Sequence, residues 1–531
     1  MKKIQLILFG FCIAGFFFSC NTKSTEEQES SEEHRNMFGH YIQRGVTKTS
    51  ESLADGYIMF TVPNSALAYL VNRKGEVVHK WKGNYSVDVS VGYLMDDGSL
   101  YQCAMDPDYP VFGHGGPYGR IQKISWEGKM LWDFEYANRE EIVHHDIAVM
   151  PNGNILAIAY ELESYEDAIA MGRNPDLIPK DGPWLEKIIE IEPQGYDDGK
   201  IVWEWHLKDH LIQDFDPTKA NYGTPKDHPE LLDFNMGNPI PPAITQDSLD
   251  IMIANGMAER NETLGSRGAD IYHFNSINYH EALDQIVISS PHLNEIFIID
   301  HSTTTTEAAG HSGGKSGKGG DFLYRWGNPE NYQRGDSTDQ QLFGQHDARW
   351  IEDGKPGVGN LTVFNNHPPS EIDFFKEVMG NPSKNYSAVF EIITPLDSKG
   401  LYHIEKDQPF APEKPTWVYT SEDTLSFYSP FISGAHRMQN GNTLINEGAR
   451  GRFFEVTPAG EKVWEYLNPY RGEIRKPNGD PVNFMFLTYS QFRATFIPAD
   501  HQAFAGKDLK PVDPQPEEFK LPPKKEKKEE E

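Results

Sequence analysis

The sequence predicts an all-β fold, a six-bladed β-propeller with long capping inserts on one face. Three observations predict it: a repeated phrase that ends in tryptophan, hairpin-forming turns between short strands, and the composition. The 531 residues include 46 Gly, 36 Pro and 12% aromatic side chains. That balance suits many short strands joined by turns better than long helices.

The repeat is a strand, a glycine-containing turn and a second strand that ends in tryptophan, as in RIQKISWEGKMLW. Its ends are 51 residues apart from Trp81 to Trp132 and 47 apart from Trp417 to Trp464, a spacing typical of one four-stranded blade. Six copies predict six blades, and we expect each tryptophan to pack between neighbouring sheets. The repeat positions are Trp81, Trp132, Trp203, Trp326, Trp417 and Trp464.

Polar turns start a further strand in three copies. These phrases begin at Asp96 (DDGSLYQC), Pro151 (PNGNILAIAYE) and Gln439 (QNGNTLINEG). Asn-Gly and Asp-Gly pairs tolerate positive φ and favour tight hairpins. We expect the strands that follow these turns to be the ones nearest the propeller axis.

Four segments are too long for hairpin turns and are expected to cap one face of the propeller. They are 161–187, 206–271, 301–321 and 367–386. Part of 244–262 is rich in Ala, Leu, Ile and Met, which predicts a helix there.

The start of the chain is predicted to be a lipoprotein signal peptide over residues 1–20. It has a basic beginning, an apolar run over 4–18 and then Ser19-Cys20. The run is short of the roughly 20 residues that span a bilayer. The pattern therefore predicts a lipid on Cys20 that anchors the protein to a membrane of the cell envelope, on the periplasmic or the cell-surface side.

The remaining boundaries follow from composition. Residues 21–55 begin with a polar, acidic stretch that lacks the apolar side chains of a core, which predicts a disordered tether. Residues 56–498 are expected to form the propeller, and 499–531 an extended charged tail.

Cysteine content and charge argue against a disulfide-stapled fold and against a nucleic-acid-binding protein. Once Cys12 is removed with the signal and Cys20 carries a lipid, only Cys103 remains, so no intramolecular disulfide can staple the fold. Cys103 is expected to be a buried apolar residue. The formal net charge of −30 makes nucleic acid an improbable partner.

Candidate functional residues stand in three polar clusters of the central blades. They are His144-His145-Asp146, His273-Phe274-Asn275-Ser276 and Gln345-His346-Asp347. Equivalent positions on successive blades converge on the propeller axis. We therefore expect three imidazoles and an amide to meet in one funnel, although they lie some 200 residues apart in the sequence.

These clusters lie in longer blocks that resemble the bacterial arylsulfotransferase (ASST) family, in the same order and over about residues 90–500. The blocks are HHDIAVMPNGNILAIAYE, HFNSINYHEALDQIVISS, FGQHDARW and SGAHRMQNGNTLINEGARGRFFEVTPAGEKVWEY. The resemblance implies a six-bladed propeller that moves a sulfuryl group from an aryl sulfate ester to a phenolic acceptor. It implies a sulfohistidine intermediate, and neither a nucleotide donor nor a cofactor or metal.

The resemblance also assigns roles. It makes His346 of the QHD block the nucleophile and makes His273 and Asn275 the pair that contacts the sulfate. His145 is the third catalytic residue, with His144 beside it in substrate binding. A neutral imidazole is available near pH 7 to attack sulfur, and other imidazoles can transfer protons or stabilise charge.

One departure from the family concerns charge. The family carries an arginine after the phrase Ser-Ser, whereas Ser289-Ser290 is followed here by Pro291. His292 is next to it, and the insert GHSGGKSGKGG supplies His311, Lys315 and Lys318; any one of these can replace that charge, and the alternative is that the insert is only a flexible loop. His436 is a second-rank candidate for substrate binding, because the NGN turns align Ser433 with His145.

Three alternatives remain open at this point. Pro291 favours a propeller that binds a sulfated or anionic ligand without turning it over. Tryptophan-marked blades also occur in quinone-dependent oxidoreductases. Finally, three neutral imidazoles can hold zinc with an open position, although the family resemblance accounts for the same residues without a metal.

Overall fold

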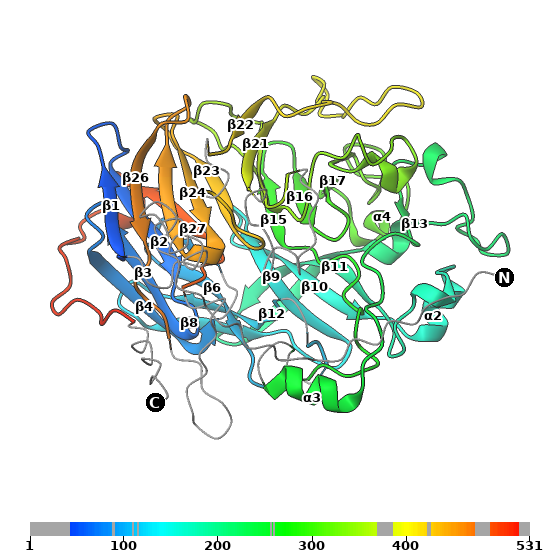
Figure 1. Ribbon diagram of the computed structural model, residues 1–531, viewed down its shortest axis with the longest axis horizontal. Helices are drawn as coiled ribbons and strands as arrows, with labels where there is room; N and C mark the ends of the chain where they lie inside the picture. Colours follow the sequence, from blue (N-terminus) through cyan, green and yellow to red (C-terminus); the bar gives the residue numbers. More distant parts are fainter. Residues whose placement is uncertain are drawn as a thin grey trace, which may run out of the picture. The chain divides into compact units, whose positions relative to one another are not determined.

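The described residues of the computed structural model are 43–87, 91–108, 111–113, 116–254, 258, 261–368, 386–421, 426–472 and 489–519. They form six antiparallel sheets arranged as the blades of a propeller, with 38% strand and 9% helix (Figure 1). This confirms the predicted fold class.

Each blade runs from an innermost to an outermost strand. The first blade consists of β27 (Ala494–Pro498), β2 (Gly56–Thr61), β3 (Ser65–Asn72) and β4 (Val77–Val87). The second consists of β5 (Gly92–Leu94), β6 (Leu100–Met105), β7 (Gly119–Ile124) and β8 (Met130–Glu135). The third consists of β9 (Glu141–Val149), β10 (Ile155–Leu162), β11 (Trp184–Gln194) and β12 (Asp198–His206).

The other three blades follow in chain order. The fourth consists of β15 (Ser276–His280), β16 (Gln285–Ser290), β17 (Glu295–Asp300) and β18 (Tyr324–Trp326). The fifth consists of β19 (His346–Trp350), β20 (Leu361–Asn365), β21 (Ala388–Ile392) and β22 (Trp417–Tyr419). The sixth consists of β23 (Gly434–Arg437), β24 (Thr443–Glu447), β25 (Arg452–Val456), β26 (Lys462–Leu467) and β1 (Gly45–Thr49).

Both ends of the propeller chain help to close the ring. β27 is the innermost strand of the first blade, and β1 pairs with β26 at the outer edge of the sixth. β1 therefore lies within 21–55, where the sequence predicts a tether. Residues 499–519 are likewise not only an extended tail, because the turn η7 (Gln502–Phe504) packs Phe504 against Tyr57.

The repeated tryptophans hold neighbouring blades together. In five of them the indole Nε1–H donates to the join between the third and fourth strands of the next blade. The pairs are Trp132 with Asp198 O, Trp203 with Thr303 Oγ1, Trp326 with Pro412 O, Trp417 with Pro458 O and Trp464 with Arg73 O. Trp81 packs edge to face on Trp126 of the second blade. These contacts confirm the structural role predicted for the tryptophans.

The central strands are buried on both faces because each blade packs between two others. In β10, residues 155–160 are fully buried, which explains the continuous apolar run ILAIAY. Cys103 of β6 is also fully buried and forms no disulfide. Burial raises the pKa of the Cys103 thiol, which fits the predicted apolar role.

The prediction for the innermost strands is wrong by one strand. The phrases after Asp96, Pro151 and Gln439 form β6, β10 and β24, which are the second strands of their blades. A tight turn joins the first strand to the second, so the strand nearest the axis is the one before the turn. In the third blade that strand is β9, which itself carries the HHD cluster.

The inserts do not all leave from one end of the blades. Segments 161–187 and 367–386 join second to third strands, and 206–271 joins one blade to the next. With antiparallel strands, all three leave from the end where the innermost strand begins. Segment 301–321 joins β17 to β18 and leaves from the opposite end, which corrects the prediction that every insert caps one face.

Helices are short and lie in the inserts and connections. They are α2 (Tyr165–Ala170), α3 (Gln246–Ala254) and α4 (Thr305–Ala308), and α3 confirms the helix predicted within 244–262. Within the described ranges, no helix is long and apolar enough to cross a membrane. Cys20 and the predicted signal peptide lie outside those ranges.

Candidate active site

The histidine motifs lie where innermost strands depart from regular pairing. In β9 the pairing with β10 shifts at residues 144–146, and His145 has φ of 55°. In β19 it shifts directly after His346, where Asp347 has φ of 58°, and His273 before β15 also has φ of 55°. Bulges re-aim side chains, and positive φ at non-glycine residues is concentrated at functional sites.

Four of the predicted residues gather in one cluster, which we call the histidine cluster: His145, His273, His292 and His346. The His145 and His273 ring centroids are 4.4 Å apart, and those of His273 and His292 are 4.8 Å apart. Burial lowers the pKa of His145 well below its usual value, and its interactions with His273, His144 and His346 lower it further. The rings are therefore close enough to influence one another.

The backbone around His145 is adapted to its ring. The His145 N–H donates to Gly116 O at 3.0 Å, and Gly116 has φ of 81°. A Cβ at this position would lie 2.8 Å from His145 Nε2. Glycine is thus required there both by conformation and by the close approach of the ring.

The orientation of His346 is fixed by a chain of hydrogen bonds. The Asn366 Nδ2 donates to the carbonyl oxygens of Ser429 at 2.7 Å and Ile432 at 3.0 Å, so its Oδ1 must face the other way. That oxygen lies 2.9 Å from His346 Nδ1, and Gly344 O lies 3.0 Å from the same nitrogen. Because both partners are acceptors, Nδ1 carries the proton.

His346 Nε2 therefore holds the lone pair of the ring. It accepts one hydrogen bond, from the Ile432 backbone N–H at 3.2 Å. Burial lowers the pKa of His346 to about 3, although its bond to Asn366 acts in the opposite direction. The ring is thus neutral near pH 7, and Ile432 itself has a positive φ of 51°, which is a strained conformation for a β-branched residue.

His273 forms a buried dyad with a carboxylate. Its Nδ1 donates to Asp270 Oδ2, and 16% of its side chain is exposed compared with 3% for Asp270. A carboxylate in this position fixes the orientation and the tautomer of the ring. Asp270, His273 and His292 also hold three possible metal ligands within 4.8 Å of one another.

A second chain of hydrogen bonds runs inward from His145. Its Nδ1 lies 2.8 Å from His144 Nδ1, and His144 Nε2 lies 3.0 Å from Glu186 Oε2. The other Glu186 oxygen accepts from the Phe274 N–H at 2.7 Å. Burial raises the pKa of Glu186 and lowers that of His144. When Glu186 is ionised, His144 donates to it and His145 Nδ1 donates to His144, which leaves a lone pair on His145 Nε2. When Glu186 is protonated, both hydrogen bonds run the other way and His145 Nε2 carries a proton.

Asn275 lies directly beside the peptide that precedes His346. Its Nδ2 donates to Gln345 O at 2.8 Å. Its Oδ1 is buried and has no hydrogen-bond partner among the described residues. The side chain therefore positions the backbone that precedes His346, and its oxygen can accept a hydrogen bond.

The last residue of each of the three polar clusters belongs to a second layer, which joins the blades. Each side chain there accepts a hydrogen bond from a backbone N–H of the next innermost strand. The pairs are Asp146 with Ile277 at 3.2 Å, Ser276 with Ala348 at 3.1 Å and Asp347 with Ala435 at 3.1 Å. The recurrence of Asp, Ser and Asp at this position is thus structural.

This layer, which we call the carboxylate layer, surrounds a buried arginine. Arg493 Nη1 lies 2.6 Å from Asp146 Oδ2, and Arg493 Nε lies 3.2 Å from Asp347 Oδ1. Arg349 also donates to Asp347, at 2.7 Å. Burial alone would raise the pKa of Asp347, but the two arginines lower it. His436 Nε2 lies 3.5 Å from Asp347 Oδ2, so His436 belongs to this layer.

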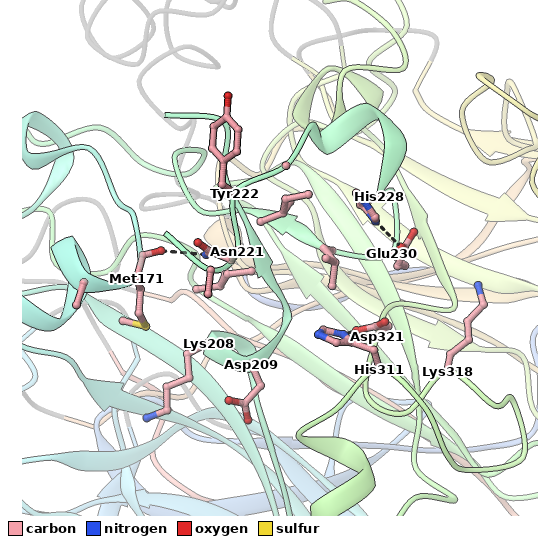
Figure 2. A pocket seen from close by; sticks show the side chains of 16 residues that line it. Met171, Lys208, Asp209, Asn221, Tyr222, His228, Glu230, His311, Lys318 and Asp321 are labelled. Atoms are coloured by element: carbon pink, nitrogen blue, oxygen red, sulfur yellow. Dashed lines mark hydrogen bonds and ion pairs between the residues drawn. The ribbon is translucent and has the colours of Figure 1, made fainter. Parts of the chain in front are cut away.

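The insert does not bring its lysines to the histidine cluster. Lys315 Nζ donates to Asp284 Oδ2 at 3.1 Å, and Asp284 lies in the turn between β15 and β16, at the far end of these strands from His273. Lys318 and His311 line a pocket against the insert of the third blade (Figure 2). In this geometry the insert does not supply the charge missing at Pro291.

Sequence reasoning missed five residues of the site: Asp270, Glu186, Asn366, Gly116 and Arg493. Asp270 lies three residues before His273, and a search for polar residues next to the recognised blocks could have found it. Asn366 lies beyond the block that ends at Trp350 and is brought back to His346 by the pairing of β19 with β20. Glu186 and Arg493 come from distant segments, an insert end and the closing strand, so only the ring closure reveals them.

The profile of the arylsulfotransferase (ASST) family matches residues 43–476, a range that includes the whole histidine cluster. No curated protein matches the chain. A protein of unknown function from Bacteroides caccae is 9% identical, with a TM-score of 0.40 over 84% of this chain and 99% of that one. The Cps50 (Swd1) β-propeller domain of Myceliophteria thermophila is 9% identical, with a TM-score of 0.36 over 81% and 91%.

Proposed function

The chain belongs to the arylsulfotransferase (ASST) family, and from this premise we propose that it transfers a sulfuryl group from an aryl sulfate to a phenol through a sulfohistidine at His346. Aryl sulfotransferase activity in general follows from the family. The observation that carries the finer proposal is the tautomer of His346, because the Asn366 chain leaves the Nε2 lone pair available within the histidine cluster.

In the first half-reaction the His346 Nε2 lone pair attacks sulfur. A nitrogen–sulfur bond forms, the bond between sulfur and the aryl oxygen breaks, and a phenolate leaves with the electron pair. In the second half-reaction the oxygen of an acceptor phenol attacks the same sulfur, and the bond to Nε2 breaks. Each half needs one proton transfer, to the leaving phenolate and from the acceptor phenol.

His273 is the proposed acid and base for these transfers. Its ring is held in place by Asp270, and it is the more exposed partner of the dyad. His145 lies against His273 and is backed by the chain to His144 and Glu186. A proton taken up at His145 Nε2 can be passed inward to Glu186, so this chain would receive the proton that the acceptor phenol releases and return it for the next leaving phenolate.

Charge on the sulfuryl oxygens needs donors or cations close to His346. The Ile432 N–H points at Nε2 and would bond a sulfuryl oxygen once sulfur takes its place, as preorganised donors do in oxyanion sites. His292, next to Pro291, adds an imidazole beside His273. These groups stand in for the arginine that the resemblance leads one to expect.

A turnover assay tests the proposal. Purified protein is mixed with a chromogenic aryl sulfate, with and without a phenol. Release of the chromophore that depends on the phenol, with matching formation of the phenol's sulfate, is the expected result. Saturable binding of the aryl sulfate with no turnover would instead favour a ligand-binding propeller, the alternative that Pro291 suggests.

We also propose that the protein is held at the cell envelope by a lipid on Cys20. The support is the sequence pattern of residues 1–20 alone. Labelling of cells with a fatty-acid probe, followed by fractionation, is expected to show a labelled membrane-bound protein and an unlabelled Cys20→Ala variant. Labelling of both would disprove the assignment.

A further inference from the structure

Two inserts meet at the outermost strands of the third and fourth blades, away from the innermost strands that carry the histidine cluster. The turn η2 (Leu207–His210) follows β12, and the insert 301–321 packs α4 and the loop after it against the same strand. Trp205 Nε1 donates to Gly320 O at 2.7 Å and fixes this contact. His210, His311 and Asp321 come together here, and Figure 2 shows the last two side by side.

The hydrogen bonds of His210 determine where its lone pair points. His210 is fully buried, and its Nε2 lies 2.8 Å from Ala308 O. A carbonyl oxygen only accepts, so Nε2 carries the proton of the neutral ring. The Nδ1 lone pair then faces Asp321 Oδ1 at 2.8 Å.

The same carboxylate oxygen has a second imidazole beside it. His311 Nδ1 also lies 2.8 Å from Asp321 Oδ1. The ligand atoms of all three residues lie within 4.8 Å of one another. An ionised carboxylate and an imidazole lone pair are both acceptors, so a contact of 2.8 Å needs either a proton on the imidazole nitrogen or a metal ion bound to both groups.

The donor set is the one that divalent transition metals prefer. Two imidazole nitrogens and a carboxylate oxygen suit zinc and its neighbours. Metal-bound histidines typically donate their other N–H to a backbone carbonyl, as His210 does to Ala308. The support is tightly fitted, because a Cβ at Gly320 would lie 2.6 Å from His210 Nε2 and 2.1 Å from Ala308 O.

The cluster is open on one side. His311 and Asp321 line a pocket of ≈ 960 Å³ (Figure 2), and 63% of the His311 side chain is exposed. Lys318 lines the same pocket. A metal held by three protein ligands would therefore have free coordination positions that face solvent and a nearby cation.

We propose that His210, His311 and Asp321 form a divalent transition-metal site that ties the two inserts together and leaves coordination positions open to the pocket. This proposal does not rest on the sulfotransfer chemistry. It also gives a role to the glycine-rich insert, which contributes no residue to the histidine cluster.

Metal binding by the purified full-length chain tests the proposal. The protein is stripped with a chelator and titrated calorimetrically with Zn²⁺, and Co²⁺ absorption reports the ligands. The variants are His311→Ala and Asp321→Asn, and the matched control is His228→Ala, an exposed histidine of the same pocket. A further variant, His292→Ala, removes a ligand from the other possible metal group, at the active site.

One equivalent of Zn²⁺ per chain is expected. His311→Ala and Asp321→Asn are expected to weaken binding by about 100-fold or more, since even outer groups of metal sites account for roughly 10- to 100-fold. His228→Ala and His292→Ala should bind as the wild type does. Absence of stoichiometric binding would overturn the proposal and leave a protonated His–Asp contact. Binding that survives His311→Ala but is lost in His292→Ala would overturn it too.

Discussion

Neighbouring residues of the same motif perform different tasks in this propeller. His145 and His346 belong to the histidine cluster, where rings are held neutral and close together. Asp146 and Asp347, one residue later, belong to the carboxylate layer, where they bond the next blade and Arg493. The motif therefore carries both a reactive group and the group that fixes its blade.

The comparison teaches how a propeller builds a precise site from distant segments. The histidine cluster contains lone pairs and protons that can move, which is a source of reactivity but not of stability. The carboxylates of the carboxylate layer are bonded by backbone N–H groups and arginines, and the layer holds the third to sixth blades in register. If this division is correct, substitutions in the two layers have separable effects.

The largest effect is expected for His346→Ala. It removes the lone pair that attacks sulfur, so transfer should fall to the background of the assay while the free energy of unfolding changes little. His280→Ala, at the opposite end of the β15 strand, is the matched control and should keep full activity. Substantial transfer by the His346 variant would mean that the nucleophile lies elsewhere.

The next effect is expected for His273→Ala. This change removes an acid and base but not the nucleophile, so kcat should drop by roughly 100- to 10,000-fold with measurable turnover left. Asp270→Asn should produce a smaller loss of the same kind. An aryl sulfate whose leaving phenol is more acidic needs less protonation, and it should therefore recover part of the loss.

In the carboxylate layer, Asp347→Asn is expected to destabilise the fold. It leaves Arg349 and Arg493 with less opposite charge in a buried place, and breaking a buried ion pair in this way typically costs about 3–5 kcal/mol. Urea unfolding measures the change. If stability is unaffected but transfer is lost, the two layers are not separable as described.

Glu186→Gln is expected to have a moderate effect that is visible mainly in pH dependence. Glutamine keeps the size and the bond to Phe274 but cannot take up a proton from His144. Turnover should fall by about tenfold and the pH profile should change shape, whereas a purely structural role would lower activity equally at every pH. Comparing kcat/KM profiles of the two proteins distinguishes these outcomes.

The last effect concerns acid stability, which develops gradually with pH. The pKa of His346 is about 3 in the fold and about 6.5 in an unfolded chain, so below pH 6.5 only the unfolded state binds the proton. Wild-type stability should therefore fall as pH drops from 6.5 towards 3, by about 1.4 kcal/mol per pH unit from this group. The His346→Ala variant should lack that part of the slope. Urea unfolding at several pH values measures this dependence, and equal slopes of the unfolding free energy against pH in the two proteins would contradict the prediction.

Much of the fold was predictable from the sequence because the tryptophan repeat reports a local and recurring contact. The position of the turns within each blade was not, since an Asn-Gly hairpin looks the same between the first and second strands as between any other pair. The sequence did not predict β1, because a strand of five residues that joins the edge of a distant sheet has no recognisable pattern of its own.

The site was predictable where chemistry and repeat position coincide, as at His145, His273 and His346. Its supporting groups were not, because Glu186 and Arg493 reach the axis from segments that only the closed ring brings there. The opposite error concerns Lys315 and Lys318, which were predicted for the site but lie elsewhere. Their charge suggested a site role, but the join between β17 and β18 leaves from the opposite end of the blade.

The most direct test of the central claim is mass spectrometry of the wild-type protein after brief exposure to an aryl sulfate without acceptor. The account predicts an acid-labile sulfuryl adduct on the peptide that contains Gln345, His346 and Asp347, which disappears when a phenol is added. An adduct on His145 or His436 instead, or no adduct in a protein that still transfers sulfate, would contradict it.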